Sequence, residues 1–332
     1  MTGEFPQDAG EGRDSAGEYT VQREEQMGTI SHAAKAMFLG GLSAAAVTAG
    51  GGSMYLAHQI AKPKGKTLEQ EKEWEIEQDL WGDFDTLQRS TYTIQGMDGY
   101  QLHCELVMTD EQSRKYVILT HGYTSNRYGT VKYIPTFRKL GYNCVIYDCR
   151  DHGENKEAAC SIGNFEAQDL LKVIEDTYAR YGDDIELGLH GESMGSATSL
   201  QVLKYHPKVR FVVADCGFAN LYELIRGGYR QMHIGFMIDP VNRVLRSKYH
   251  FDLKDTSPRD ALAGNTVPIC LIHGKDDKFI DPENSEKLSQ ATAGYCELHL
   301  VDGATHAKSR KVLGEEAYTT IVREFLENLE NS

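Results

Sequence analysis

The sequence has few of the features that would build a disulfide scaffold, a nucleic-acid-binding surface or a metal centre. Its seven cysteines in 332 residues are sparse and odd in number, which argues against a disulfide framework. With 35 basic and 49 acidic residues, its formal charge is −14, whereas nucleic-acid binding needs a basic surface. It contains no HExxH, no CxxC pair and no GxGxxG after a predicted strand. These patterns therefore predict no metal and no cofactor.

Long hydrophobic runs are also scarce, and a single stretch of 26 residues, 36–61, lacks Lys, Arg, Asp and Glu. It is long enough to cross a bilayer core of about 30 Å, although Gly and Ala dominate it. We predict a single-pass transmembrane anchor. The alternatives are a signal peptide, cut after Val47-Thr48-Ala49, and an Ala/Gly-rich segment that does not insert. The lysines after residue 61 favour a cytoplasmic enzyme domain under the positive-inside rule.

The segments on either side of this stretch are strongly charged. Residues 1–35 are predicted to be a disordered acidic tail, since the first 30 carry seven acids, two arginines and no apolar period. Residues 62–84 form a charged linker in which Thr67 and Gln70 predict a capping box. The short helix that follows should end near Leu80, carry Leu68, Ile76 and Leu80 on one face, and lead into the main domain.

Residues 85–332 show the alternating pattern of an α/β domain. Two β-type runs surround Asp98-Gly99, a hairpin signal, and short apolar strands then alternate with longer helical stretches. Such strands indicate a mostly parallel central sheet with helices on both faces. The predicted strands are Ser90–Gln95, Tyr100–Val107, Tyr116–Thr120, Asn143–Asp148, Ile185–His190, Val209–Ala214, Pro268–Ile272 and Glu297–Val301. The predicted helices are Thr130–Leu140, Asn164–Tyr181, Met194–Tyr205, Pro282–Ala293 and Glu315–Asn331.

Residues 218–256 interrupt this alternation between two predicted strands, and the segment is rich in large apolar side chains. An insertion at the carboxyl edge of the sheet predicts a small helical cap above a site. Its apolar residues either wall a substrate pocket, with Met232 and Phe236 among them, or pack on the core as an ordinary helix pair. The cap also holds four arginines, which form a solvated face or attract an anionic substrate.

The motif Gly191-Glu192-Ser193-Met194-Gly195 lies between a predicted strand and a predicted helix. This is the context of a G-x-S-x-G nucleophile elbow, in which the glycines allow a sharp turn that exposes the serine hydroxyl. The backbone N–H of Met194, at the start of the helix, would point at a developing oxyanion.

A serine nucleophile needs a base, and the base needs an acid that orients it. His306 follows the last predicted strand, whereas His121, His190 and His273 at strand ends are better explained as structural. The acid should follow the preceding strand, and we favour Asp277 over its neighbour Asp276.

A second oxyanion donor is expected in the loop His121-Gly122-Tyr123, where the N–H of Tyr123 is the candidate and an ordinary strand–helix turn is the alternative. The side chain of Tyr123 would then wall the acyl pocket.

These motifs resemble those of the α/β-hydrolase superfamily, and within it the bacterial membrane-anchored serine hydrolases of the esterase, lipase and peptidase-like type. The matching features are the HG-x loop, the GESMGS elbow, the HGKDD loop and the G-x-x-H loop. The resemblance implies Ser193 as nucleophile, Asp277 as acid, His306 as base, and Tyr123 and Met194 as oxyanion donors. It also implies an extracytoplasmic hydrolase domain, against the lysine pattern.

The sequence departs from that group after the fourth strand, where Asp151 replaces a glycine and Asn155 replaces a serine. The combined prediction is a serine hydrolase that cleaves a carboxylic ester or related acyl bond of a small-molecule substrate. The alternatives are a peptidase of the same fold and a catalytically silent binding or scaffold protein on a membrane.

Overall fold

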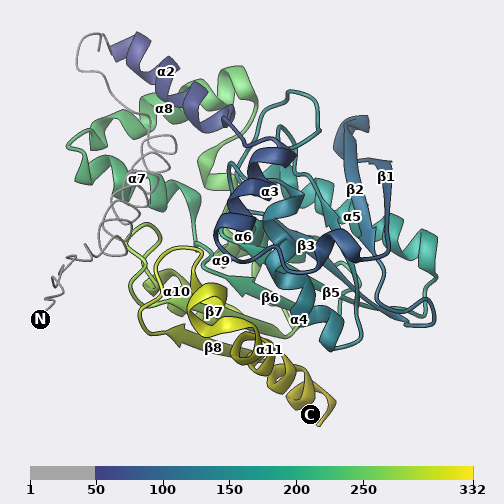
Figure 1. The fold of residues 1–332 in the computed structure, drawn as a ribbon. Helices are drawn as coiled ribbons and strands as arrows, with labels where there is room; N and C mark the ends of the chain where they lie inside the picture. The colour runs from purple at the N-terminus through teal and green to yellow at the C-terminus, as the bar shows by residue number, and fades with distance from the viewer. Residues whose placement is uncertain (1–48, 332) are drawn as a thin grey trace, which may run out of the picture.

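The computed structural model describes residues 49–331, which form an eight-stranded sheet flanked by helices (Figure 1). The strand order is β1-β2-β4-β3-β5-β6-β7-β8. The strands are β1 (Arg89–Gln95), β2 (Gln101–Val107), β3 (Lys115–Thr120), β4 (Asn143–Tyr147), β5 (Glu186–Glu192), β6 (Phe211–Asp215), β7 (Ile269–Gly274) and β8 (Cys296–Val301). The helices are α2 (Ala49–Ala61), α3 (Leu68–Glu77), α4 (Ile134–Lys139), α5 (Asn164–Tyr181), α6 (Met194–Gln201), α7 (Leu221–Gln231), α8 (Ile238–Val244), α9 (Pro258–Ala261), α10 (Glu283–Ala291) and α11 (Ser309–Glu330).

The sheet matches the arrangement expected from the sequence. Strand β2 pairs antiparallel with both β1 and β4, and every pair from β4 to β8 is parallel. The predicted hairpin turn is confirmed, since Asp98 and Gly99 both have positive φ, at 55° and 73°. With helices on both faces, this is the α/β-hydrolase fold. The parallel strands β3 to β8 therefore all deliver the loops at their carboxyl ends to the same edge of the sheet as β5.

Alternating side chains divide the strands between two hydrophobic cores. In β3, Tyr116 and Ile118 join one core while Val117 and Leu119 join the other. The first core contains α5, α6, the cap and α2, and the second contains α4, α11 and residues near Trp81. Because both faces of the strands are buried, the parallel strands are apolar throughout.

The predicted helices are present, with some differences at their ends. Helix α5 has the predicted bounds, whereas the predicted helix 130–140 begins as a 3₁₀ segment (Arg127–Tyr133) before α4. Helix α11 starts earlier than predicted, with a break at Gly314, whose φ of 75° is not helical. All seven cysteines are free, and Cys144 and Cys270 are buried as small core side chains.

The insertion 218–256 folds as the helical segment that the sequence predicts. Helix α7 is followed by a 3₁₀ turn (Gly235–Met237), α8 and a π-helical turn (Leu245–Tyr249). Its large buried residues belong to the core that covers one face of the sheet. Phe236 is 71% exposed. Its side chain is therefore not part of that core.

The predicted membrane anchor 36–61 is only partly covered by the structure. Residues 36–48 lie outside the described residues, whereas 49–61 form α2, which packs on α8 in the cap (Figure 1). Leu56 and Ile60 of α2 are about 1% exposed. Between residues 49 and 331, no helix has the length and apolar character needed to cross a bilayer.

Helix α3 has the predicted capping box but is shorter than predicted. The capping box of Thr67 and Gln70 is present, and the helix ends at Glu77. However, Ile76 is 51% exposed, while Glu71 and Glu75 are buried. The apolar periodicity was a poor guide, because the buried glutamates meet lysines from other segments instead of an apolar core.

A buried ion network fixes the loop after β3 to the sheet. Arg127 contacts Glu105 of β2 at 3.3 Å, and it donates to Asp148 just after β4 through both its backbone N–H and its guanidinium. The side chains of these residues are 4% exposed or less. Removing one partner of such a network leaves uncompensated charge in a low-dielectric interior.

We therefore expect Arg127→Met to lower the free energy of unfolding by about 3–5 kcal/mol, measured by urea denaturation. The matched control is Arg114→Met, because Arg114 pairs with Asp184 on the surface, where loss of an ion pair costs about 1 kcal/mol or less. Similar losses in the two variants would show that the Arg127 network is not a significant support.

Candidate active site

Ser193 lies in a strained turn between β5 and α6. Its φ of 56° and ψ of −114° place it in a region that non-glycine residues rarely adopt. The flanking glycines make the turn possible: a Cβ on Gly191 would lie 2.1 Å from the carbonyl oxygen of Gly195, and one on Gly195 would lie 2.0 Å from that of Thr120. The backbone N–H of Ser193 donates to Asp215 in β6, which ties the turn to the neighbouring strand.

The structure brings Ser193, His306 and Asp277 into one hydrogen-bonded chain. The Oγ of Ser193 lies 2.9 Å from Nε2 of His306, and Nδ1 of His306 lies 2.7 Å from Oδ2 of Asp277. An ionised carboxylate only accepts, so Nδ1 carries the proton and Nε2 accepts from the serine hydroxyl. The ring of His306 packs edge-on against Phe279, 4.8 Å between centroids.

The carboxylate of Asp277 is held in its ionised form. Burial favours the neutral acid, but hydrogen bonds from His273, His306 and the N–H of Ile280 outweigh it and lower the pKa of Asp277 well below its usual value. Its Oδ1 accepts from the N–H groups of Phe279 and Ile280 at 2.8 and 2.9 Å. By contrast, the side chain of Asp276, the alternative candidate, is exposed.

The candidate oxyanion donors lie on either side of Ser193. Met194 is the first residue of α6, where helical N–H groups have no partner within the helix. Across the site, a Cβ on Gly122 would lie 3.6 Å from that of Ser193, so the loop that carries Tyr123 runs next to the nucleophile turn.

The hydroxyl of Tyr123 is directed to α2. It donates to the carbonyls of Gln59 and Ile60 at 2.9 and 3.0 Å. The connection between α2 and α3 contacts the same loop, since the N–H of Lys66 donates to the carbonyl of Thr124. The segment before the sheet therefore contacts the loop that runs next to the nucleophile turn, a contact that nothing in the sequence indicated.

Two buried histidines hold the Tyr123 loop against the loop after β4. Nε2 of His121 accepts from the N–H of Cys149, and Nε2 of His152 accepts from that of Thr124. Burial lowers the pKa of both to about 4, so both rings stay neutral. His121 is thus structural, as the sequence predicts, and the rings keep two loops in register.

Asp151 and Asn155, the two departures from the pattern of similar hydrolases, both form hydrogen bonds with the backbone in and around the loop after β4. Asp151 has a φ of 65°, which explains why a glycine is suited to this position, and its Oδ1 accepts from the N–H of Ala158. Asn155 donates to the carbonyls of Asp148 and Cys149, and its Oδ1 accepts from the N–H of His103.

Sequence reasoning missed a buried charged cluster next to the nucleophile. Glu192 forms a 2.8 Å ion pair with Lys132 and accepts a hydrogen bond from the hydroxyl of Tyr133. Lys132 also lies 3.7 Å from Glu75 of α3. These contacts lower the pKa of Glu192 despite its burial. Glu192 belongs to the G-x-S-x-G motif, but no sequence pattern near Lys132 or Glu75 indicates that either side chain lies beside it.

Two other carboxyl groups in this region have a raised pKa, in contrast to Glu192. Burial raises the pKa of Glu75 to about 7, against the attraction of Lys132, and the carboxylates of Glu71 and Glu192 add to the rise. Burial also raises the pKa of Asp215 to about 7. Asp215 accepts from Ser309, at the start of α11, at 2.9 Å.

The raised pKa of Glu75 predicts a pH-dependent stability. The folded protein keeps a proton on Glu75 that the unfolded chain releases above pH 4.5, so stability falls as pH rises towards 7. Glu75→Gln stays neutral and removes this loss. Relative to the wild type, its free energy of unfolding should increase by on the order of 3 kcal/mol from about pH 5 to about pH 8 in urea denaturation.

The matched control is Glu73→Gln on the exposed side of α3. A constant difference between Glu75→Gln and the wild type across this range would show that Glu75 does not take up a proton on folding.

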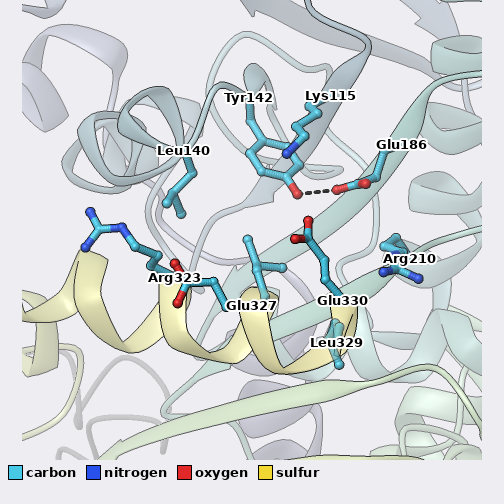
Figure 2. A pocket seen from close by; sticks show the side chains of 10 residues that line it. Lys115, Leu140, Tyr142, Glu186, Arg210, Arg323, Glu327, Leu329 and Glu330 are labelled. Carbon is cyan, nitrogen blue, oxygen red and sulfur yellow. Dashed lines mark hydrogen bonds between the residues drawn. The ribbon is translucent and has the colours of Figure 1, made fainter. Parts of the chain in front are cut away.

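Neither a metal site nor the cavity in Figure 2 competes with this site. Within residues 49–331, no three His, Cys, Asp or Glu side chains form a group that could hold a metal ion. The cavity in Figure 2, about 260 Å³, lies at the amino ends of β3 and β5, whereas Ser193 follows the carboxyl end of β5. Its lining residues are Lys115, Leu140, Tyr142, Glu186, Arg210, Arg323, Leu326, Glu327, Leu329 and Glu330.

Comparison with known proteins finds similarity to hydrolases. Residues 111–225 match a family model described as serine aminopeptidase, S33. The uncharacterized protein YqkD of Bacillus subtilis is 28% identical over 89% of this chain and 97% of its own length. The esterase YjfP of Escherichia coli is 24% identical over 57% of this chain and 79% of its own. The structure of the Pyrococcus furiosus esterase Pf2001 superposes with a TM-score of 0.60, at 22% identity, over 75% of this chain and 96% of that one.

Proposed function

We propose that the chain, which has the α/β-hydrolase fold, is a serine hydrolase acting on a carboxylic ester through an acyl-enzyme. The observation that carries the proposal is the continuous chain from Ser193 through His306 to Asp277, with bonds of 2.9 and 2.7 Å. This is the geometry of an activated nucleophile, its base and an orienting acid.

In the proposed reaction, Ser193 attacks the carbonyl carbon while Nε2 of His306 takes the hydroxyl proton. Asp277 keeps the ring in the tautomer that accepts at Nε2 and stabilises the imidazolium that forms. His306 then returns the proton to the leaving alcohol. Water, activated by the same ring, hydrolyses the acyl-enzyme and restores Ser193.

The tetrahedral oxyanion would be bound by the backbone N–H groups of Met194 and Tyr123. Such preorganised donors act in a low-dielectric site, where losing one typically reduces kcat about 10²–10³-fold. The strained turn at Ser193 fixes the first donor relative to the nucleophile. The neutral rings of His121 and His152 would fix the loop that carries the second.

The ester is favoured over the amide because an alkoxide is a better leaving group than an amide anion, and because esterases are among the similar proteins. The family model described as a serine aminopeptidase supports a second candidate, a peptidase with the same nucleophile. A third, a silent binding protein on a membrane, is disfavoured by the intact hydrogen-bonded chain at the site.

The first test of the function is labelling at the nucleophile. A fluorophosphonate should modify the wild-type protein at Ser193, read by mass spectrometry of the peptide that contains it. Ser193→Ala should lose this label and lower kcat on short p-nitrophenyl esters by on the order of 10⁴ or more.

The matched control is Ser196→Ala, a buried serine one turn further along α6. The control should label as the wild type does. Absence of labelling in the wild type would favour the silent protein, and aminoacyl anilides cleaved faster than esters would favour the peptidase.

The two neighbouring acids give a second test. Asp277→Asn should leave His306 in the wrong tautomer and lower kcat by on the order of 10⁴, as the loss of an orienting carboxylate does in serine proteases. Asp276→Asn is the matched control and should have a small effect, because its side chain is exposed. The reverse order of effects would assign the acid to Asp276.

A further inference from the structure

The cap carries a surface charge opposite in sign to that of the whole chain. Residues 224–250 contain five exposed basic side chains and one acidic residue, Asp239, within a protein of formal charge −14. The neighbouring helix α2 contains no Lys, Arg, Asp or Glu. The five basic residues are Arg226, Arg230, Arg243, Arg246 and Lys248.

Residues 49–331 provide few acidic partners for this positive charge. Within the part of the chain that the structure describes, Arg246 alone of the five has an ion pair, to Asp252 at 3.5 Å. Asp239 instead accepts a hydrogen bond from the hydroxyl of Tyr222 at 2.7 Å. The remaining four cations therefore face solvent.

Exposed apolar side chains lie directly beside these cations. Phe236 is 71% exposed and follows Gly235, where an added Cβ would lie 3.0 Å from Cγ of Arg230. Met54 of α2 is 43% exposed, and its sulfur lies 3.7 Å from Nζ of Lys248. An apolar side chain next to a flexible cation is typical of helices that lie in a membrane interface.

The elements that carry these residues form one layer. Helix α2 packs on α8 and on the following turn, where His58 contacts the hydroxyl of Tyr249 at 3.0 Å. Helix α7 packs on the 3₁₀ turn that contains Phe236, and that turn packs on α8. Figure 1 shows α2, α7 and α8 gathered at one end of the molecule.

The chain ahead of the structure also enters at this layer. Residues 36–48 join α2 and contain no Lys, Arg, Asp or Glu. They number 13, fewer than the roughly 20 residues that a helix needs to span a bilayer. Since residues 49–61 are packed on the cap, a spanning anchor over 36–61 would have to give up those contacts.

We propose that the exposed side chains of α2 and residues 224–250, here called the cap face, dock on a membrane surface that contains anionic lipid. The arginines and Lys248 bind the anionic headgroups, while Phe236 and Met54 enter the interface. Because α2 contacts Tyr123, whose loop runs next to Ser193, docking brings that loop close to the bilayer. The docking itself does not depend on the proposed hydrolase activity.

The experiment is co-sedimentation of the full chain with vesicles of phosphatidylcholine, with and without phosphatidylglycerol. A chain of net charge −14 should be repelled by anionic vesicles, so stronger binding to them can come only from a local basic surface. Arg226→Gln/Arg230→Gln/Arg243→Gln should weaken that binding by one to two orders of magnitude, at about five-fold per cation. High salt should weaken wild-type binding as well.

Matched controls separate the cap face from charge and apolarity in general. Arg114→Gln/Lys172→Gln/Lys287→Gln removes three cations elsewhere and should bind as the wild type does. Phe236→Ser should weaken binding several-fold, whereas Val312→Ser, at a residue of α11 that is 48% exposed, should not. Thermal unfolding and hydrolysis of a short soluble ester should be unchanged in all four variants.

Three results would overturn the proposal. Equal binding to both kinds of vesicle, resistant to salt, would indicate insertion of the chain ahead of α2 in place of docking. Wild-type binding by the triple cap variant would exclude the cap face. An equal loss in the two triple variants would make the effect one of net charge.

Discussion

The left-handed backbone of Ser193 is the constraint on which the rest of the site depends. A non-glycine residue held at a φ of 56° costs on the order of 1–3 kcal/mol and persists only where its surroundings impose it. Here β3 and β6 impose it from both sides: the carbonyl of Thr120 packs against Gly195, and the carbonyl of Asp215 accepts from Ser193. Because β3 and β6 lie on either side of β5, the order of strands in the sheet determines where the hydroxyl group of Ser193 is held.

Next to that turn lies a buried cluster of charged side chains in place of an apolar core. Glu192, Lys132 and Glu75 connect the nucleophile turn, the segment before α4 and helix α3. A buried network of this kind contributes little net stability compared with a well-packed apolar one, but breaking it is costly, so it resists alternative packings. Helix α3 is therefore held by polar contacts of Glu71 and Glu75 with Lys66 and Lys132.

The sequence predicted the features that local patterns determine. The strand–turn–helix around Ser193, the hairpin at Asp98-Gly99 and the capping box of Thr67 all follow from residues close together in the chain. It failed where the partner is distant: Glu75 is buried because Lys132 lies opposite, and α2 is packed because the cap folds against it. A run of Ala and Gly without charge has the same composition whether it faces lipid or a protein groove, so hydropathy could not separate these outcomes.

The hydroxyl of Tyr123 donates hydrogen bonds to Gln59 and Ile60 of α2. The part of the chain that functions together therefore begins earlier than the α/β fold itself. A chain begun at Lys66 would retain all eight strands and the Ser193–His306–Asp277 chain, yet the side chain of Tyr123 would lose both acceptors and the buried face of α8 would be uncovered. Substitutions in α2 can therefore alter the contacts of the Tyr123 side chain without changing the sheet. Helix α2 lies outside the α/β domain that the sequence patterns define. It is therefore a place where related chains can differ in the substrates that they accept.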